Sequence, residues 1–476
     1  MTDQSSQPNK EEPLGSQPSL PEHTGPADED RTQSPIPVAE HSLAPPPPVS
    51  LKTIDEHPKD LVEQEKPVES PPQPAPAPQA PVGRLMSLDA LRGFDMFWII
   101  GGAYLLRAFE AIATQGGDSP SQFQRIIDFL IHHMHHADWE IAGLLTGLEL
   151  NLRGVELWQK GMVFYDLIFP LFVFIVGTSL VYSLTRNVAE KGRANAVRRV
   201  LKRSVVLYAL GIIFSGGFAT EWPDIRLMGV LNRIALCYLC AGLLFLFLKA
   251  RGLILVCIGL LVSYWALMSF VALPEIGAGS MEKGANLANY IDEHYLSGMK
   301  WDDTWDPEGL LSTLPAVATC LLGVFSGLLL INQSYSNSRK VFYLLFGGAA
   351  ALVLGWIWGV EFPVIKKIWT SSYVLVTGGW SAILLGLFYL VIDVWHWRWW
   401  CQPFVWIGLN PITVYMANNI IGFHSLANRF AGGDIRNFLN DRVYQGLGEV
   451  LVNLVALSFA VLLCWLLHRK KIFIRV

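Results

Sequence analysis

The chain has 476 residues, of which 52% are hydrophobic, 12% are aromatic and only 16% are charged. Soluble globular chains carry roughly 25% charged residues, so this composition favours a membrane protein over a soluble enzyme. The formal net charge of −4 offers no broad basic surface, and we expect no nucleic-acid partner.

Residues 1–83 differ in composition from the rest of the chain. Nineteen of the 28 prolines lie there, including the run Pro45–Pro48. Because few apolar groups are available to offset the entropy of ordering, this pattern predicts a disordered Pro-rich cytoplasmic tail with local polyproline II character. We expect no cleavable signal peptide, since no apolar segment lies near Met1. Residues 84–476 are predicted to form one transmembrane domain.

Strongly apolar stretches fill this second part. Each is about 20 residues long, which is the length that a membrane-spanning helix needs. They predict an all-α polytopic membrane protein with about ten transmembrane helices. The expected spans are 91–112, 163–184, 201–219, 227–248, 252–273, 309–331, 341–360, 372–394, 404–423 and 447–467. The span 404–423 is the weakest, because Asn410, Pro411, Asn418 and Asn419 interrupt it.

Lysine and arginine in the short loops predict the orientation, because cytoplasmic loops carry an excess of both residues. Basic residues collect in alternate loops, at 186–203, 249–251, 339–340 and 469–475. The opposite loop, 274–308, is strongly acidic. Both termini are therefore expected in the cytoplasm and the loop 113–162 on the far side. Lys366 and Lys367 are the exception, because they fall in a loop predicted to be exoplasmic.

Several polar residues interrupt the apolar segments, where they are costly and often functional. They are Asp95, Asp166, Asn232, Arg233 and Asn410. Cys237 and Cys240 also lie inside an expected span, where small apolar side chains in helix packing explain them better than metal or redox chemistry. The sequence Asp306-Pro307-Glu308-Gly309 is typical of a helix start, with Asp as the cap and Pro in the first turn.

Ordered motifs along residues 84–476 resemble those of the heparan-α-glucosaminide N-acetyltransferase family of transmembrane acyltransferases, whose bacterial branch is largely uncharacterised. Arg84–Gly93 resembles the first motif of that family, and His136-Ala137-Asp138-Trp139 resembles its His-Ala-x-Trp element. Further similar segments follow in the same order. They are Asp166–Gly177, Gly229–Arg233, Lys367–Val374 and Gly408–Pro411.

The resemblance implies a function. Family members carry an acetyl group from cytoplasmic acetyl-CoA to an amino sugar or envelope glycan on the far side of the membrane. The active histidine of the family corresponds to His136, and an imidazole that titrates near pH 6.5 can act as a base or accept the acyl group. Asp166 is the second expected catalytic residue.

The same resemblance suggests binding residues. Coenzyme A phosphates need cations, and we expect the cofactor-binding residues to be Asp89, Arg92, Arg186, Arg203, Asn232 and Arg233. Trp139, Trp369 and Asn410 are the expected substrate-binding residues. We expect acetyl-CoA as co-substrate, no metal, a lipid bilayer as partner and, by analogy, a homodimer in a bacterial inner membrane.

Two departures from the family pattern stand out. An asparagine near the end of the first span of the family is replaced here by Ile100-Gly101-Gly102-Ala103-Tyr104. About twenty extra residues, Ile141–Lys160, separate Trp139 from the Asp166 helix. The pairs Glu149/Arg153 and Glu156/Lys160 are spaced i,i+4, so this insertion predicts an amphipathic helix at the exoplasmic surface.

The run His132-His133-Met134-His135-His136 has three interpretations. His132 and His136 are spaced i,i+4, as in helical zinc motifs, but no Glu occupies the usual hydrolase position within the run. We rank an acyl-transfer base first for His136, surface histidines second for the others, and zinc third.

Two other functions remain open at this stage. An amino-sugar transporter or binding protein would use His136 and Asp166 to line a polar cavity, although no internal repeat of the kind common in transporters is visible. Alternatively, the chain is a degenerate family member that has lost catalysis, which would explain the missing asparagine.

Overall fold

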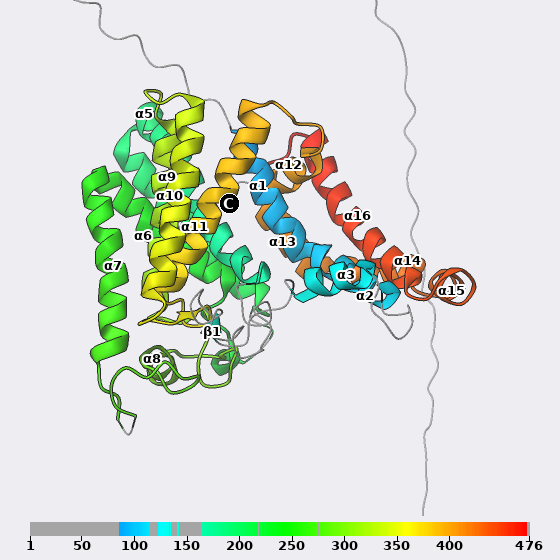
Figure 1. The fold of residues 1–476 in the computed structure, drawn as a ribbon, viewed down its shortest axis with the longest axis horizontal. Coiled ribbons are helices and arrows are strands. Elements are labelled where there is room, and N and C mark those ends of the chain that lie inside the picture. The colour runs from blue at the N-terminus through cyan, green and yellow to red at the C-terminus, as the bar shows by residue number, and fades with distance from the viewer. Residues whose placement is uncertain are drawn as a thin grey trace, which may run out of the picture. The chain divides into compact units, whose positions relative to one another are not determined.

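The computed structural model describes residues 85–113, 122–132, 134, 140–141, 163–217, 219, 221–274 and 276–473. All of them belong to one compact unit, Pro76–Val476. The described chain is mostly helical (Figure 1). The predicted disordered tail, residues 1–83, lies outside the described residues.

The elements follow one another along the chain without a repeated unit. The first half contains α1 (Met86–Phe97), η1 (Trp98–Gly102), α2 (Ala103–Ala113), α3 (Gln122–His132), β1 (Glu140–Ile141), α5 (Tyr165–Phe214), η3 (Trp222–Asp224), α6 (Val230–Phe247), α7 (Ala250–Phe270) and α8 (Leu287–Tyr295). The second half contains α9 (Thr313–Ile331), α10 (Asn337–Trp358), β2 (Val364–Ile365), α11 (Ser371–Phe388), η4 (Tyr389–Val394), α12 (Gln402–Leu409), α13 (Pro411–Ile421), α14 (Phe423–Ala431), α15 (Asp434–Phe438), η5 (Leu439–Val443) and α16 (Leu447–Arg469).

Seven described helices are long and apolar enough to cross a membrane, where the sequence predicted about ten spans. The chain is therefore an integral membrane protein, although the number ten is not confirmed. Part of the difference lies in α5, which covers two expected spans in 50 residues. The helical assignment continues through the basic loop predicted between them. Only Gly192, with φ of +81°, leaves the helical conformation, because glycine tolerates positive φ.

Two other expected spans are interrupted helices. The span 91–112 is divided by the π-helical segment η1, in which Gly101 has an extended backbone with φ of 170°. The span 404–423 is divided at Asn410, with φ of −134° and ψ of 50°. Pro411, which lacks a backbone N–H, begins the next helix there. The polar residues that weakened this prediction therefore mark a real break in the helix.

Reciprocal glycines bring pairs of helices into backbone contact. A Cβ added at Gly177 in α5 would lie 1.9 Å from the Cys320 carbonyl oxygen in α9, and one added at Gly323 would lie 1.9 Å from the Phe174 carbonyl oxygen. Gly93 in α1 and Gly408 in α12 approach the opposite backbones equally closely. Small residues allow this close approach in membranes, where dispersion replaces the hydrophobic effect in holding helices together.

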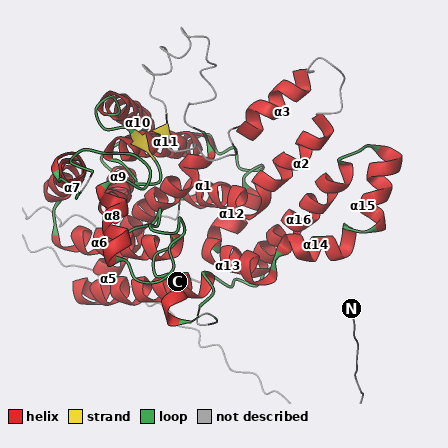
Figure 2. Ribbon diagram, turned by 90° about the horizontal axis from the view of Figure 1, so that it is seen from below, coloured by secondary structure: helices red, strands yellow, loops and turns green. Residues whose placement is uncertain are grey.

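The bundle has two ends that matter for function. At the first, which we call the Leu85 end, Asp393 accepts a hydrogen bond from the Ser87 amide, and Asn337 accepts one from the Tyr389 hydroxyl. From there α10 runs to the second, the Lys366 end, where β1 pairs with β2 in antiparallel register, Glu140 opposite Ile365. Figure 2 shows this small sheet beside α10 and α11.

Substituting Gly177 with alanine should destabilise the protein by about 1–3 kcal/mol, because the new methyl group overlaps the α9 backbone. Thermal unfolding of the detergent-purified protein measures this loss. The matched control is Gly259→Ala in α7, where an added Cβ meets nothing within 4 Å and helix propensity should improve. Equal melting temperatures for the two variants would contradict the proposed helix contact.

Candidate active site

A cavity of about 420 Å³ opens among the helices at the Lys366 end. Its apolar wall comes from α1, α5, α6 and α13, and its polar wall comes from the loops that join the helices at this end. The lining residues with a polar side-chain group are Tyr165, Arg226, Trp301, Glu308, Lys366, Lys367, Trp369 and Tyr415. A mostly apolar cavity of this size with a few convergent polar groups is typical of a small-molecule site.

A buried ion pair lies at the edge of this cavity. Lys366 Nζ donates to Asp166 Oδ1 at 2.9 Å, and the Asp166 side chain is fully buried. Asp166 stands in the first turn of α5, and the Tyr373 hydroxyl donates to its backbone carbonyl at 2.7 Å. Asp166, expected to be catalytic, thus lies behind a lysine that the sequence did not suggest as functional.

The neighbouring lysine is also paired. Lys367 Nζ lies 2.8 Å from Asp302 Oδ2 and 5.4 Å from the centre of the Trp305 ring. These two pairs explain why Lys366 and Lys367 depart from the charge pattern of the loops. Each ammonium is balanced by a carboxylate from another part of the chain. Neither lysine therefore adds an unpaired positive charge to its loop.

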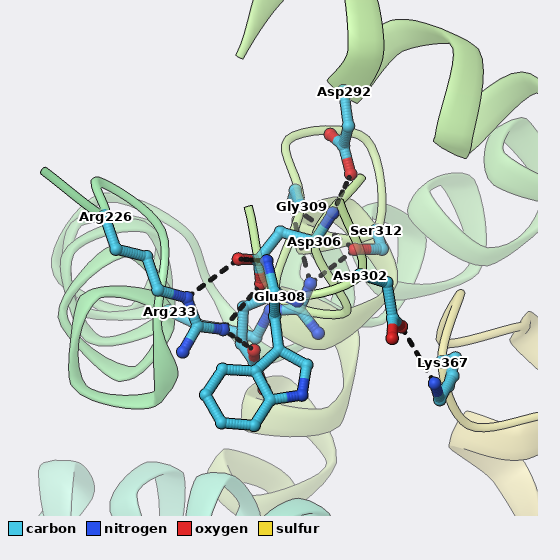
Figure 3. A network of polar contacts seen from close by, with 10 residues as sticks. Arg226, Arg233, Asp292, Asp302, Asp306, Glu308, Gly309, Ser312 and Lys367 are labelled. Carbon is cyan, nitrogen blue, oxygen red and sulfur yellow. Dashed lines mark hydrogen bonds and ion pairs between the residues drawn. The ribbon is translucent and has the colours of Figure 1, made fainter. Parts of the chain in front are cut away.

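The other side of the cavity carries a larger polar network, drawn in Figure 3. Arg226 holds Asp306 through two hydrogen bonds of 2.8 Å and holds Glu308 Oε2 through a third of 2.8 Å. Arg233, fully buried, donates to the Ser312 hydroxyl and stands 4.9 Å from the centre of the Trp369 ring. Asp292 accepts from the Leu310 amide at 2.8 Å.

This network corrects one interpretation of the sequence. Helix α9 begins at Thr313, and the residue that precedes it is Ser312, so Asp306 does not cap that helix. Asp306 instead binds Arg226, and its carboxylate also accepts from the Trp301 amide at 3.1 Å. Glu308 lines the cavity. The Asp-Pro-Glu-Gly segment therefore builds the site, and its partner Arg226 is 80 residues away in the chain.

Burial changes the acidity of the loop residues at this end. It raises the pKa of Asp292 to about 6, although hydrogen bonds from the Leu310 and Asp306 amides oppose the shift. It raises the pKa of Glu308 to about 7. Burial also lowers the pKa of the Lys366 ammonium, against the attraction of Asp166. Burial disfavours the charged form in each case.

Trp369 occupies a strained position in the cavity wall. Its φ is +55°, a conformation that bulky residues rarely adopt and that is found mostly where surrounding contacts impose it. Its indole N–H donates to the Thr319 hydroxyl at 3.1 Å, and its ring meets Phe169 edge-on. Trp369, expected to bind substrate, does line the cavity.

The other expected binding residues lie elsewhere. Arg92 donates to the Gly408 carbonyl at 3.0 Å and lies 3.4 Å from Asp89, while Asn410 donates to the Ile472 carbonyl. Arg186 is exposed and pairs with Glu190. The Arg203 guanidinium lies over the Tyr238 ring, and Asn232 donates to the Tyr208 carbonyl. Among the described contacts, none joins Arg233 to Arg92, Arg186 or Arg203.

His136 and Trp139 lie outside the described residues, as do His133, His135 and the expected amphipathic helix apart from Ile141, which is in β1. His132 ends α3, with its side chain undescribed. Within the described part of the chain, no group of three or more His, Cys, Asp or Glu residues could hold a metal ion.

Comparison with known proteins shows what the chain is similar to. Residues 144–356 match the family model described as "Heparan-alpha-glucosaminide N-acetyltransferase, catalytic". The protein of that name from Mus musculus is 27% identical over 393 residues, covering 69% of this chain. The one from Homo sapiens is 28% identical over 401 residues, covering 70% of this chain. The chain spans 58% of the length of each relative.

The chain is thus similar to the heparan-α-glucosaminide N-acetyltransferase family. The resemblance read from the motifs is thereby confirmed. The range matched by the N-acetyltransferase model contains Asp166, Arg226, Arg233 and Glu308, and it ends before Lys366. His136 precedes its first residue.

Removing one partner of the Asp166–Lys366 pair should destabilise this N-acetyltransferase-like chain by about 3–5 kcal/mol, because a buried charge loses its counter-ion. Lys366→Met and Asp166→Asn should each show this loss in thermal unfolding. The double variant should lose less than the sum of the two, which a double-mutant cycle measures. Additive losses would show that the two side chains do not interact.

Stability should also depend on pH through Asp292. Its pKa is about 6 in the folded chain and about 3.9 in an unfolded one, so the folded state binds the proton more tightly. Asp292 therefore contributes fully to the free energy of unfolding below about pH 4. As pH rises towards 6 this contribution is lost, which lowers the free energy of unfolding by up to about 3 kcal/mol. In Asp292→Asn the fall in melting temperature between pH 4 and 6 should become shallower, and an unchanged slope would contradict this assignment.

Proposed function

We propose that this chain is a transmembrane N-acetyltransferase that moves an acetyl group from cytoplasmic acetyl-CoA to the amine of an amino sugar or glycan at the Lys366 end. The printed name of the two relatives supports this reaction. One observation carries the proposal. Asp166, which lies in a segment similar to the family's Asp-Leu-x-Phe-Pro motif, holds the Lys366 ammonium at the wall of a cavity large enough for a ligand.

The link between β1 and β2 supports a role for His136 at this cavity. Glu140 pairs with Ile365, the residue before Lys366. Four peptide units separate Glu140 from His136, and an extended chain of that length spans at most about 14 Å. On the basis of this short tether we propose that His136 acts at the ion pair.

In this proposal His136 takes the proton of the attacking amine or carries the acetyl group itself. The Lys366 ammonium faces the cavity and would stabilise negative charge that develops on the acetyl oxygen. Asp166 acts through Lys366, because it fixes the position of the ammonium. An ammonium held by a buried carboxylate needs little reorganisation during the reaction.

We propose that the coenzyme approaches from the Leu85 end, where Asp89 and Arg92 belong to the first motif. Arg92, Arg186 and Arg203 supply cations that suit its phosphates. Arg233 is not part of this set, since it is bound to Ser312 at the other end. The proposal includes a bacterial inner membrane, cytoplasmic termini and, by analogy with the family, a homodimer.

The test is transfer of labelled acetyl from acetyl-CoA to D-glucosamine by the protein in proteoliposomes. His136→Ala should lower the rate by about 10²–10⁴-fold, the usual contribution of a positioned base, while acetyl-CoA affinity is retained. The matched control is His294→Ala, at an exposed histidine of α8 that does not line the cavity. Full activity in His136→Ala would remove this histidine from the mechanism.

The two interrupted helices favour a second candidate, an amino-sugar transporter. α1 continues through η1 into α2 and α12 breaks into α13, and α1 packs against α12. Transporters commonly bind substrate at such breaks. Uptake of labelled glucosamine by proteoliposomes without acetyl-CoA would support transport and reject the transferase.

A further inference from the structure

We propose that Glu308 binds the protonated amine of the acceptor in the cavity and takes its proton before the acetyl group is transferred. This inference rests on the proposed acetyl transfer. It assigns the polar wall that carries Arg226 and Glu308 to recognition of a cationic amine, and it gives the Asp-Pro-Glu-Gly segment a chemical role.

The position of Glu308 suits this role. It is the only carboxylate among the described residues that line the cavity. Asp166, Asp302 and Asp306 lie behind the wall, each held by a cation that does line it: Lys366, Lys367 and Arg226, respectively. An amine that enters the cavity therefore meets one acid at its surface, and that acid is Glu308.

The Arg226 guanidinium makes fewer hydrogen bonds with Glu308 than with Asp306. Arg226 makes a two-bond contact with Asp306, through Nε and Nη2, and reaches Glu308 only through Nη2, which it shares. Two-bond contacts between guanidinium and carboxylate are the stronger arrangement. Arg226 thus serves chiefly Asp306 and gives Glu308 one shared hydrogen bond, while the positive charge of Arg233 also acts on Glu308.

Counting charges across the network leads to the same result. Two cations, Arg226 and Arg233, face three acids, Asp292, Asp306 and Glu308. When all five are ionised, the cluster carries one excess negative charge. The Lys366 and Lys367 pairs on the adjoining wall are each neutral. A buried excess charge is costly, so it favours either a proton or a cationic ligand.

The surroundings of Glu308 agree with a group that exchanges protons. Arg226, Arg233, Asp306, Lys366 and Tyr415 are the titratable or charged groups that interact with it. Burial raises its pKa to about 7, within the range useful to a general base at neutral pH. Trp301, over which Arg226 lies at 5.1 Å, and Trp369 add aromatic faces that attract cations and sugar rings.

The step balances without a further reactant. The ammonium gives one proton to the Glu308 carboxylate and becomes a neutral amine. Its lone pair forms the C–N bond to the acetyl carbon, while the bond from that carbon to sulfur, or to the nitrogen of His136 if it carries the acetyl group, breaks. The second amine proton goes to the leaving atom, through His136 where that residue acts as the base and directly where it carries the acetyl group. Glu308 then releases its proton to solvent.

The experiment compares binding of D-glucosamine and D-glucose to the detergent-purified full chain at pH 7.5. Glu308→Gln keeps the size of the side chain and removes its charge. We expect its affinity for glucosamine to fall by 10-fold or more while its affinity for glucose is unchanged. Glu293→Gln, an exposed acid on α8, is the matched control and should bind both sugars like the unsubstituted protein.

A second measurement does not depend on how the variant folds. In the unsubstituted protein, glucosamine affinity should rise between about pH 6 and 7, where Glu308 ionises and the glucosamine amine is still protonated, while glucose affinity stays flat. Equal affinities for the two sugars, or unchanged glucosamine binding in folded Glu308→Gln, would overturn the inference. Glu308-dependent binding without acetyl transfer would reject only the proposed function, and transfer unaffected by Glu308→Gln would reject only the amine site.

Discussion

The buried pair between Lys366 and Asp166 is the contact on which the site depends. It joins the first turn of α5 to the loop that follows β2, and that loop also carries Lys367 and Trp369. A lysine withdrawn from water needs its counter-ion, so the pair fixes two segments that are 200 residues apart in the chain. The cavity lies beside this pair, and Lys366 forms part of its polar wall.

Around that pair, the rest of the bundle is held by close helix contacts. α5 approaches α9 at Gly177 and Gly323, and α1 approaches α12 at Gly93 and Gly408. In a lipid environment such contacts replace the burial of large apolar side chains. The interrupted helices can therefore stay in place although Gly101 and Asn410 break their backbone hydrogen-bonding pattern. The helix backbones are in close contact where the helices cross, and the helices are irregular beside the cavity.

Much of the helical pattern could be predicted from local sequence, because apolar length decides it. The breaks at Gly101 and Asn410 and the long α5 could not be placed to the residue, since they depend on neighbouring helices. The motifs singled out Asp166 and Trp369, which lie at the cavity, yet Lys366 appeared only as an exception in the charge pattern. The roles of Arg226 and Glu308 were missed, because an ion pair between positions 82 residues apart leaves no periodic or local signal.

The break at Gly192 has a consequence for the membrane surface. The first half of α5, residues 165–191, rises about 40 Å at 1.5 Å per residue, whereas the hydrocarbon layer is about 30 Å thick. Roughly 10 Å of helix must project beyond the lipid tails. That projecting end carries Arg186 and Lys191, and the second half of α5 brings Arg193, Arg198 and Arg199 just after the break. Their positive charges suit the depth of the anionic phosphate headgroups, and they resist movement of this end further into the bilayer.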